Sequence, residues 1–201
     1  MYKQTQNIFA YKSLPALNFD QKMRLNEYDL NTIIVDTERL LPESLNEGVA
    51  IRKDLAPVEL KIMADPQKIK DALLNLIVNA KEAMPFGGTL TLSSRKVSFA
   101  DIFSGFAYDC TTGACALLTI SDTGIGMDDY TKDKVEEPFF STKEGGKGLG
   151  FPVAARIIRN HGGSINIDSS KGVGTTVSIY LPLLKPAYDR LSPIPLPPSL
   201  T

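Results

Sequence analysis

One segment of the chain sets amide and carboxylate side chains along a single side of an expected helix. In DALLNLIVNAKEAM, residues 71–84, the polar positions Asp71, Asn75, Asn79 and Glu82 lie opposite an apolar stripe. Asparagine is a mediocre helix former, so two of them four residues apart suggest a function. An amide oxygen can ligate Mg²⁺ without adding charge beside phosphates. A plain solvated stripe would show the same pattern.

The string SDTGIGM, residues 121–127, follows an apolar run that is typical of a buried strand. Asp122 would stand at the end of that strand, where a carboxylate can accept a hydrogen bond from an exocyclic amino group such as that of adenine. Gly124 and Gly126 would let the backbone approach a flat ring closely. An ordinary D-x-G turn has the same residues, so both interpretations stay open.

Residues 141–152, STKEGGKGLGFP, place four glycines before an expected helix: Gly145, Gly146, Gly148 and Gly150. A glycine-rich turn that opens a helix offers free N–H groups and the positive end of the helix dipole to phosphates. The spacing differs from the G-x-x-x-x-G-K-[ST] loop, because Phe151 follows the last glycine. A flexible linker is the alternative.

The elements that would position these residues alternate between helices and strands. Helices are expected over 29–41, 66–84 and 152–160, and strands over 49–55, 60–62, 89–97, 116–120 and a hairpin within 165–181. In the last helix, Val153, Ile157 and Ile158 are expected to face inward, and the stretch 124–150 is expected to be mobile. The order predicts an α+β fold, a two-layer sandwich with helices on one face of a mixed β-sheet.

Composition and charge argue against several classes of function. The 201 residues are 43% hydrophobic with a formal net charge of −1, so there is no basic footprint for nucleic acid. No apolar run approaches the roughly 20 residues that span a bilayer, and we expect a cytoplasmic domain. Cys110 and Cys115 form either a disulfide hairpin or a pair of small residues flanking a turn, and we prefer the second.

The order and spacing of the motifs resemble the Bergerat ATP-binding fold, which gyrase, heat-shock chaperones, histidine kinases and mismatch-repair ATPases share. The matching strings are Asn75 with Asn79, Asp122–Met127, Glu137–Lys143 and Gly146–Phe151. The E-P-F-F-S-T-K string and the N-H-G-G-x-I ending resemble the catalytic domain of sensor histidine kinases. The resemblance covers roughly residues 29–184. Residues 1–28 would be a linker or the stub of a phosphoacceptor hairpin, and the proline-rich residues 185–201 a disordered tail.

The resemblance implies transfer of the γ-phosphoryl group of Mg-ATP to a histidine on a separate dimerisation domain. It implies Mg²⁺ ligation by Asn79 and Asn75, and catalytic roles for Asn75, Lys143 and Lys147. The implied binding residues for ATP or ADP are Asn79, Glu82, Asp122, Gly124, Gly126, Met127, Phe140, Thr142, Gly146, Gly148, Leu149 and Gly150. The implied partners are the histidine-bearing domain, indirectly a response-regulator receiver domain, and a second copy of the full-length protein.

Position 75 sets this chain apart from the superfamily members that hydrolyse ATP, which resemble one another in having a carboxylate there as general base. With Asn75, hydrolysis is expected to be slow. Three residues depart from the kinase pattern: Lys147 replaces a threonine, Phe151 a leucine and Glu136 an aromatic residue. These departures leave open a regulatory nucleotide-binding module without phosphoryl transfer. An adaptor that has lost ATP is a further alternative, against which the intact Asn79, Asp122 and glycines argue.

The chain has a single histidine, His161, in the string R-N-H-G-G at the end of an expected helix. The resembling kinases present their acceptor histidine in an H-E-x-x-x-P-like context on a helical hairpin, so the resemblance gives His161 no acceptor role. We expect a structural histidine at a helix end instead. The chain would then act on a histidine that lies outside it.

Overall fold

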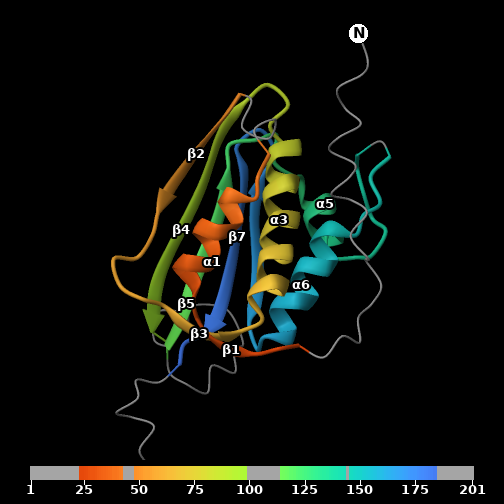
Figure 1. Ribbon diagram of the computed structural model, residues 1–201. Helices are drawn as coiled ribbons and strands as arrows, with labels where there is room; N and C mark the ends of the chain where they lie inside the picture. Colours follow the sequence, from red (N-terminus) through yellow and green to blue (C-terminus); the bar gives the residue numbers. More distant parts are fainter. Residues whose placement is uncertain (1–22, 43–47, 99–113, 144, 185–201) are drawn as a thin grey trace, which may run out of the picture.

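The computed structural model describes residues 23–42, 48–98, 114–143 and 145–184 (Figure 1). Its elements are β1 (Asn26–Asp29), α1 (Leu30–Arg39), β2 (Val49–Asp54), β3 (Lys61–Ala64), α3 (Pro66–Glu82), β4 (Gly88–Ser98), β5 (Ala114–Asp122), α5 (Asp129–Lys134), α6 (Gly150–Asn160), β6 (Ser164–Ser170) and β7 (Gly174–Pro182). The main sheet has the order β2-β4-β5-β7-β6. Strand β2 runs parallel to β4 and the other neighbours are antiparallel, so the sheet is mixed.

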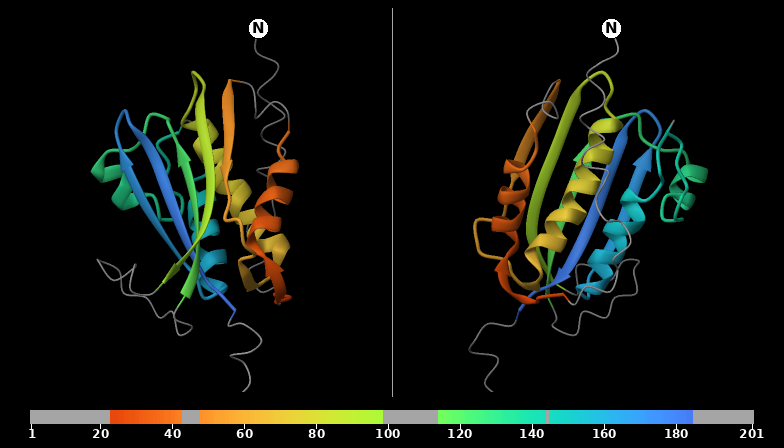
Figure 2. Two further views of the ribbon diagram at one scale, coloured as in Figure 1. Left: turned by 90° about the vertical axis from the view of Figure 1, so that its left-hand side faces the viewer. Right: turned by 45° about the vertical axis from the view of Figure 1, so that its right-hand side comes forward.

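Helices α1, α3 and α6 lie side by side on one face of this sheet (Figure 2). The apolar side of α3 enters the core through Ile69, Leu73 and Leu76, and alternate strand residues such as Leu90 and Leu92 meet it from the sheet. Each of these side chains is at most 3% exposed, and full burial of such a side chain contributes roughly 1.5–3 kcal/mol. The predicted two-layer α+β sandwich is therefore confirmed.

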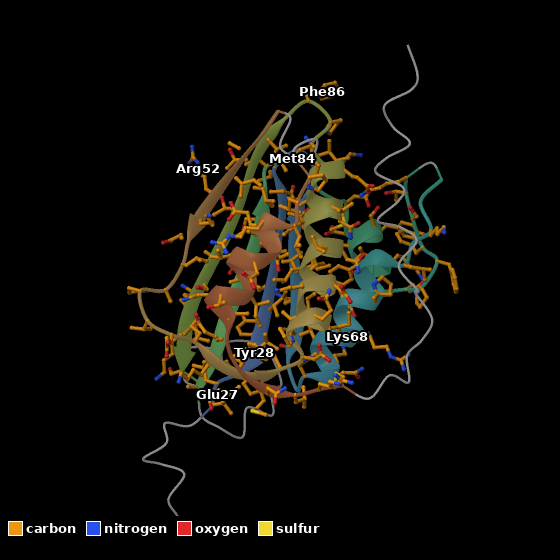
Figure 3. All side chains as sticks on the ribbon, in the orientation of Figure 1. Glu27, Tyr28, Arg52, Lys68, Met84 and Phe86 are labelled. Atoms are coloured by element: carbon orange, nitrogen blue, oxygen red, sulfur yellow. The ribbon has the colours of Figure 1, made fainter. Side chains whose placement is uncertain are left out.

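Helix α3 begins where the sequence predicts, because the Asp65 carboxylate accepts a hydrogen bond from the Lys68 N–H at 3.3 Å and Pro66 opens the helix. At its other end α3 passes into the turn that contains Met84 and Phe86. Figure 3 shows these two residues at one end of the sandwich and Tyr28 at the opposite end. The polar stripe of α3 therefore ends at the Met84 end of the molecule.

Strand β1 pairs with β3 in a separate two-stranded antiparallel sheet, with Asn26 opposite Ala64 and Asp29 opposite Lys61. The sequence predicts β3 but not its partner. The folded body thus includes residues just ahead of the boundary expected at residue 29. The proposed hairpin stub within residues 1–22 and the proline-rich tail lie outside the described residues.

The expectation for α6 is correct in part, and one helix is missing from the sequence prediction. Helix α6 buries Ile158 as predicted and Ile157 packs against the core, whereas Val153 is only half-buried; Phe151, Ala154 and Ala155 complete the buried side. The stretch 124–150, for which no helix is predicted, contains α5, whose cap is Asp128. Because no residue of α5 is buried, this helix has no apolar periodicity from which it could be predicted.

A second, smaller apolar cluster contains Val97, Cys115 and Leu117, with Tyr180 packed against it. Cys115 is 1% exposed and disulfide-bonded, which favours the disulfide alternative over the one preferred from the sequence. Cys110 lies outside the described residues. Within the described ranges, the helices are too short or too polar to cross a membrane.

Candidate functional site

The polar stripe of α3 meets the first residue of α6. A Cβ added at Gly150 would lie 3.4 Å from both Oδ1 and Nδ2 of Asn79, so the glycine leaves this amide open to the start of α6. No described residue forms a hydrogen bond with the Asn79 side chain. The amide is therefore available to a ligand placed between the two helices.

The start of α6 is an uncapped helix N-terminus. Leu149 occupies the cap position and makes no side-chain hydrogen bond to the helix, which spans 11 residues. The first N–H groups of an α-helix have no partner within the helix, and the helix dipole adds partial positive charge there. Phosphate oxygens could therefore bind at the start of α6, beside the side-chain amide of Asn79.

A lysine of the glycine-rich segment lies at the same place. The Nζ atom of Lys143 is 2.6 Å from Oε2 of Glu82 and 3.5 Å from the backbone carbonyl oxygen of Asn79. The structure therefore brings Asn79, Glu82 and Lys143 together, although they come from two separate sequence motifs.

Asp122 ends β5 and accepts backbone hydrogen bonds from Gly124, at 2.8 Å, and from Thr175. Burial raises the pKa of the Asp122 carboxyl above its usual 3.8, because removal from water disfavours the charged form. The two N–H groups and the nearby charge of Lys143 offset part of this rise. The result is a half-buried acceptor, suited to an amino group of a base.

The pocket loop, residues Asp122–Gly126, packs closely on two neighbouring segments. The Ile125 N–H donates to the carbonyl of Ala83 at 2.9 Å, and the Ile125 carbonyl accepts from the N–H of Gly172 at 2.7 Å. A Cβ at Gly124 would lie 2.5 Å from the Ala83 oxygen. At Gly126, where φ is +62°, it would lie 2.1 Å from the Ser170 oxygen. Packing within the protein therefore requires glycine at both positions, whether or not a ligand lies against the loop.

Ser169 and Thr175 position the pocket loop, and neither is predicted from the sequence. The Ser169 hydroxyl accepts from the Met127 N–H at 2.9 Å and contacts the Thr175 hydroxyl at 2.9 Å. Thr175 in turn donates its N–H to Asp122. Small hydroxyl residues beside a hairpin turn are the available sequence signal, but nothing local relates Ser169 to Met127.

The lid, residues Met127–Gly150, contains α5 and then passes through Phe139 and Phe140. Phe139 has φ of 70°, which is uncommon for a residue other than glycine, and it is 76% exposed. Its N–H donates to the Gly148 carbonyl at 2.9 Å. The Phe140 ring meets the Tyr130 ring edge-on, with 6.2 Å between centroids. Such strained positions cluster at functional loops.

Other residues predicted for the site lie at its edge or away from it. Asn75 is half-buried one turn before Asn79, while Thr142 and Lys147 are exposed in the lid. Within the described ranges, no hydrogen bond or ion pair joins Lys147 to α3. Nor do these ranges contain a group of three or more His, Cys, Asp or Glu residues that could hold a metal ion. A metal at Asn79 would therefore need amide and phosphate oxygens.

Residues 64–185 match the family described as histidine kinase-, DNA gyrase B- and HSP90-like ATPases. The chain belongs to this family. Its relatives include the sensor kinase CckA of Brucella abortus, 35% identical over 86% of this chain and 18% of CckA. Sporulation kinase B of Bacillus subtilis is 34% identical over 77% of this chain and 33% of that kinase. The chain thus spans a minor part of the length of these relatives.

Solved structures agree with this assignment. The catalytic domain of histidine kinase ThkA superposes with a TM-score of 0.64 at 25% identity, over 80% of this chain and 97% of that domain. Full-length ShkA in complex with AMPPNP shows the same fold, with a TM-score of 0.65 at 21% identity over 83% of this chain and 32% of ShkA. The described body is the ATP-binding domain of the histidine-kinase type.

Two departures from the kinase pattern have visible roles in this ATPase domain. Glu136, which replaces an aromatic residue of the lid, forms an ion pair with Arg159 of α6. Phe151, which replaces a leucine, is 5% exposed and belongs to the main core. A charged contact therefore replaces the expected apolar anchor of the lid, and the larger ring fills the core at the start of α6.

His161 caps the C-terminus of α6 and is 8% exposed. Its Nδ1 lies 2.7 Å from the Ile157 carbonyl oxygen, and its Nε2 accepts from the Asp65 N–H at 3.1 Å. This pattern requires a ring whose proton is on Nδ1. Asp65 precedes α3, and a rise of 1.5 Å per residue separates it from Asn79 by roughly 20 Å. The structural role expected for His161 is therefore confirmed, at the opposite end of α3 from the candidate nucleotide site.

Proposed function

We propose that this domain transfers the γ-phosphoryl group of Mg-ATP to a histidine on a separate helical dimerisation domain. The observation that carries the proposal is the convergence of three groups: the base acceptor Asp122, the unpaired amide of Asn79 and the lid cation Lys143. Asn79 and Lys143 lie beside the uncapped start of α6, and the charge of Lys143 also reaches Asp122. Catalysis of this kind depends on positioning and charge stabilisation, which is what such an arrangement can supply.

Each residue has a separate task in the proposal. Asp122 accepts a hydrogen bond from the adenine amino group, and Gly124 and Gly126 shape the pocket around the ring. Asn79, assisted by Asn75, ligates Mg²⁺. When bound, Mg²⁺ would neutralise part of the charge of the phosphates. Lys143 and Lys147 approach the phosphates from the lid. The other lid residues of the proposed site are Met127, Phe140, Thr142, Gly146, Gly148, Leu149 and Gly150.

The acceptor histidine lies outside the described body in this proposal. Both ring nitrogens of His161 are engaged by backbone groups, roughly 20 Å from Asn79 along α3. Position 75 is an asparagine, so water lacks a carboxylate base and hydrolysis should be slow. The domain should therefore neither label itself nor release phosphate rapidly.

Further partners follow from the same proposal. The solved histidine kinase ThkA was captured in complex with the response regulator protein TrrA. By analogy, a receiver domain would take the phosphoryl group from the acceptor histidine in a second step. A full-length homodimer, joined through its helical domain and working in the cytoplasm, completes the proposed arrangement.

The test uses ATP labelled at the γ-phosphate, first with the chain alone and then with a separately supplied helical domain from one of the related kinases. We expect no label on the chain and slow label on the added histidine, because a bimolecular encounter replaces a covalent link. Strong label on His161, or rapid release of phosphate, would contradict the proposal. Tight nucleotide binding without transfer to any supplied domain would favour the regulatory module instead.

A further inference from the structure

The lid lysine lies inside the proposed nucleotide site. Lys143 contacts the Glu82 carboxylate at 2.6 Å and the Asn79 carbonyl at 3.5 Å. Its charge also reaches Asp122, since it lowers the pKa of that carboxyl against the larger effect of burial. Lys143 thus contacts α3 at the residue proposed to bind the metal and lies within electrostatic range of the base acceptor, although it comes from the lid.

The Glu82 carboxylate is negatively charged, as are the phosphates of the proposed nucleotide ligand. It stands less than one helical turn beyond Asn79, on the same side of α3 as the amide, so its carboxylate would lie near the phosphates. A carboxylate at this place repels phosphate oxygens and attracts the same cation that the phosphates would attract. Lys143 therefore has two alternative anionic partners at one location.

We propose that Glu82 competes with the nucleotide phosphates for Lys143. In the nucleotide-free chain Glu82 holds the lid lysine against the last turn of α3, and it releases the lysine when Mg-nucleotide binds. This inference rests on the proposed function and changes one part of it: Glu82 acts through Lys143 as a positioning residue and does not itself hold the nucleotide.

The exposure of the pair suits an exchange of partners. The Lys143 and Glu82 side chains are 41% and 26% exposed, and ion pairs with such access to water are weak. A lysine forms charge-assisted hydrogen bonds with phosphate oxygens as well as with a carboxylate, and the phosphates of a nucleotide together carry more negative charge than one carboxylate. The phosphates should therefore displace Glu82 without unfolding the last turn of α3.

The first test is calorimetric titration with Mg²⁺ and the non-hydrolysable analogue AMPPNP. Glu82→Gln should tighten binding about two- to fivefold, the range for a partly exposed ion pair. Lys143→Met should weaken binding, and in that background Glu82→Gln should have a smaller effect than in the native chain. Weaker or unchanged binding in Glu82→Gln would overturn the proposal, and so would equal tightening in both backgrounds.

A matched control is available in the same chain. Glu38 pairs with Lys53 between α1 and β2, with side chains 24% and 39% exposed, and this pair lies outside the site. Glu38→Gln removes a carboxylate of the same kind and exposure, so AMPPNP affinity should not change. A tightening equal to that of Glu82→Gln would mean that overall charge explains the effect, which overturns the proposal.

The second test needs no nucleotide. The Lys143 N–H donates to the Ser141 hydroxyl at 3.1 Å and the Gly146 N–H to the Lys143 carbonyl at 3.0 Å. Hydrogen exchange of these two amides should be faster in Glu82→Gln and in Lys143→Met, to the same degree. Unchanged exchange in both variants would contradict only the inference about Glu82. Failure of the native chain to bind any nucleotide would contradict the proposed function itself.

Discussion

The pocket loop and the lid are consecutive in the chain but are held by different interactions. Backbone hydrogen bonds join Ile125 to Ala83 and Gly172, and two glycines of the loop leave no room for a Cβ. Between Glu136 and Gly150 the lid contacts the helices through ion pairs with partly exposed side chains, Lys143 with Glu82 and Glu136 with Arg159. Its crowded glycines, Gly146 and Gly148, meet only other lid residues, and Val135 packs on the core at the end of α5. The base side of the site is therefore preorganised, whereas the phosphate side can rearrange.

This difference suits the proposed reaction. A rigid base pocket selects the nucleotide before any movement, since its polar groups are already in place. Ion pairs of partly exposed side chains contribute about 0.2–1 kcal/mol each, so the lid can exchange partners when phosphates arrive. Each half of the site can therefore be altered separately by substitution.

The largest effect is expected from Gly126→Ala, compared with Gly145→Ala in the lid. Both glycines have positive φ, +62° and +70°, but only Gly126 is crowded, because nothing lies within 4 Å of a Cβ at Gly145. Strain and the clash with Ser170 should cost the first variant about 2–4 kcal/mol of unfolding free energy. The second variant has no clash and should lose only the cost of the left-handed backbone, about 1–2 kcal/mol. Urea unfolding measures both, and similar losses would mean that the loop is not preorganised.

The next effect concerns the metal. Asn79→Ala should weaken ADP binding about tenfold in the presence of Mg²⁺, because a ligand of the ion is removed. With Mg²⁺ chelated, the variant and the native chain should bind ADP alike. Calorimetric titration under both conditions decides. Equal losses of ADP affinity with and without Mg²⁺ would mean that Asn79 supports helix α3 or the base pocket and does not ligate the metal.

A smaller effect is expected in the pH dependence of stability. The folded chain raises the pKa of Asp122 above 3.8, so the folded state binds the proton more tightly than the unfolded state. Stability should therefore fall as pH rises from about 4 through this raised pKa. Asp122→Asn should flatten that decline. Since Asp71 also has a raised pKa from burial and is present in both proteins, only the difference between their unfolding curves is informative.

The smallest effect is expected at the lid anchor. Glu136→Gln should change the unfolding free energy by less than about 1 kcal/mol, because both side chains of its ion pair with Arg159 are exposed. Added salt should diminish even this difference. Hydrogen exchange in α5 should nevertheless become faster. A loss of several kcal/mol would show that the lid is as firmly packed as the pocket loop.

Much of the fold follows from local patterns. The Asp65-Pro66 cap and the alternating residues of β4 and β7 predict their elements, because burial imposes those periods on the sequence. Asp122 is predicted at a strand end for the same reason. In contrast, α5 has no buried side and is missed, and β1 is recognisable only through its pairing with β3.

The site is predicted in part. The motif residues Asn79 and Asp122 can be recognised by type and spacing, but their partners cannot. Glu82 and Lys143 are separated by 61 positions, and the Ser169 hydroxyl reaches the Met127 N–H across 42. No local pattern encodes such contacts, because they exist only once the helices and the sheet have packed.

The preorganised base pocket is tested most directly by titrating the chain with ADP and with inosine diphosphate, which has a carbonyl where adenine has an amino group. Asp122 can accept from the amino group but faces the carbonyl oxygen as a second acceptor. ADP should therefore bind about 10- to 100-fold more tightly, the cost of 1–3 kcal/mol for a mispaired buried group. Asp122→Asn should remove this preference while remaining folded. Equal affinities of the native chain for the two nucleotides would contradict the account.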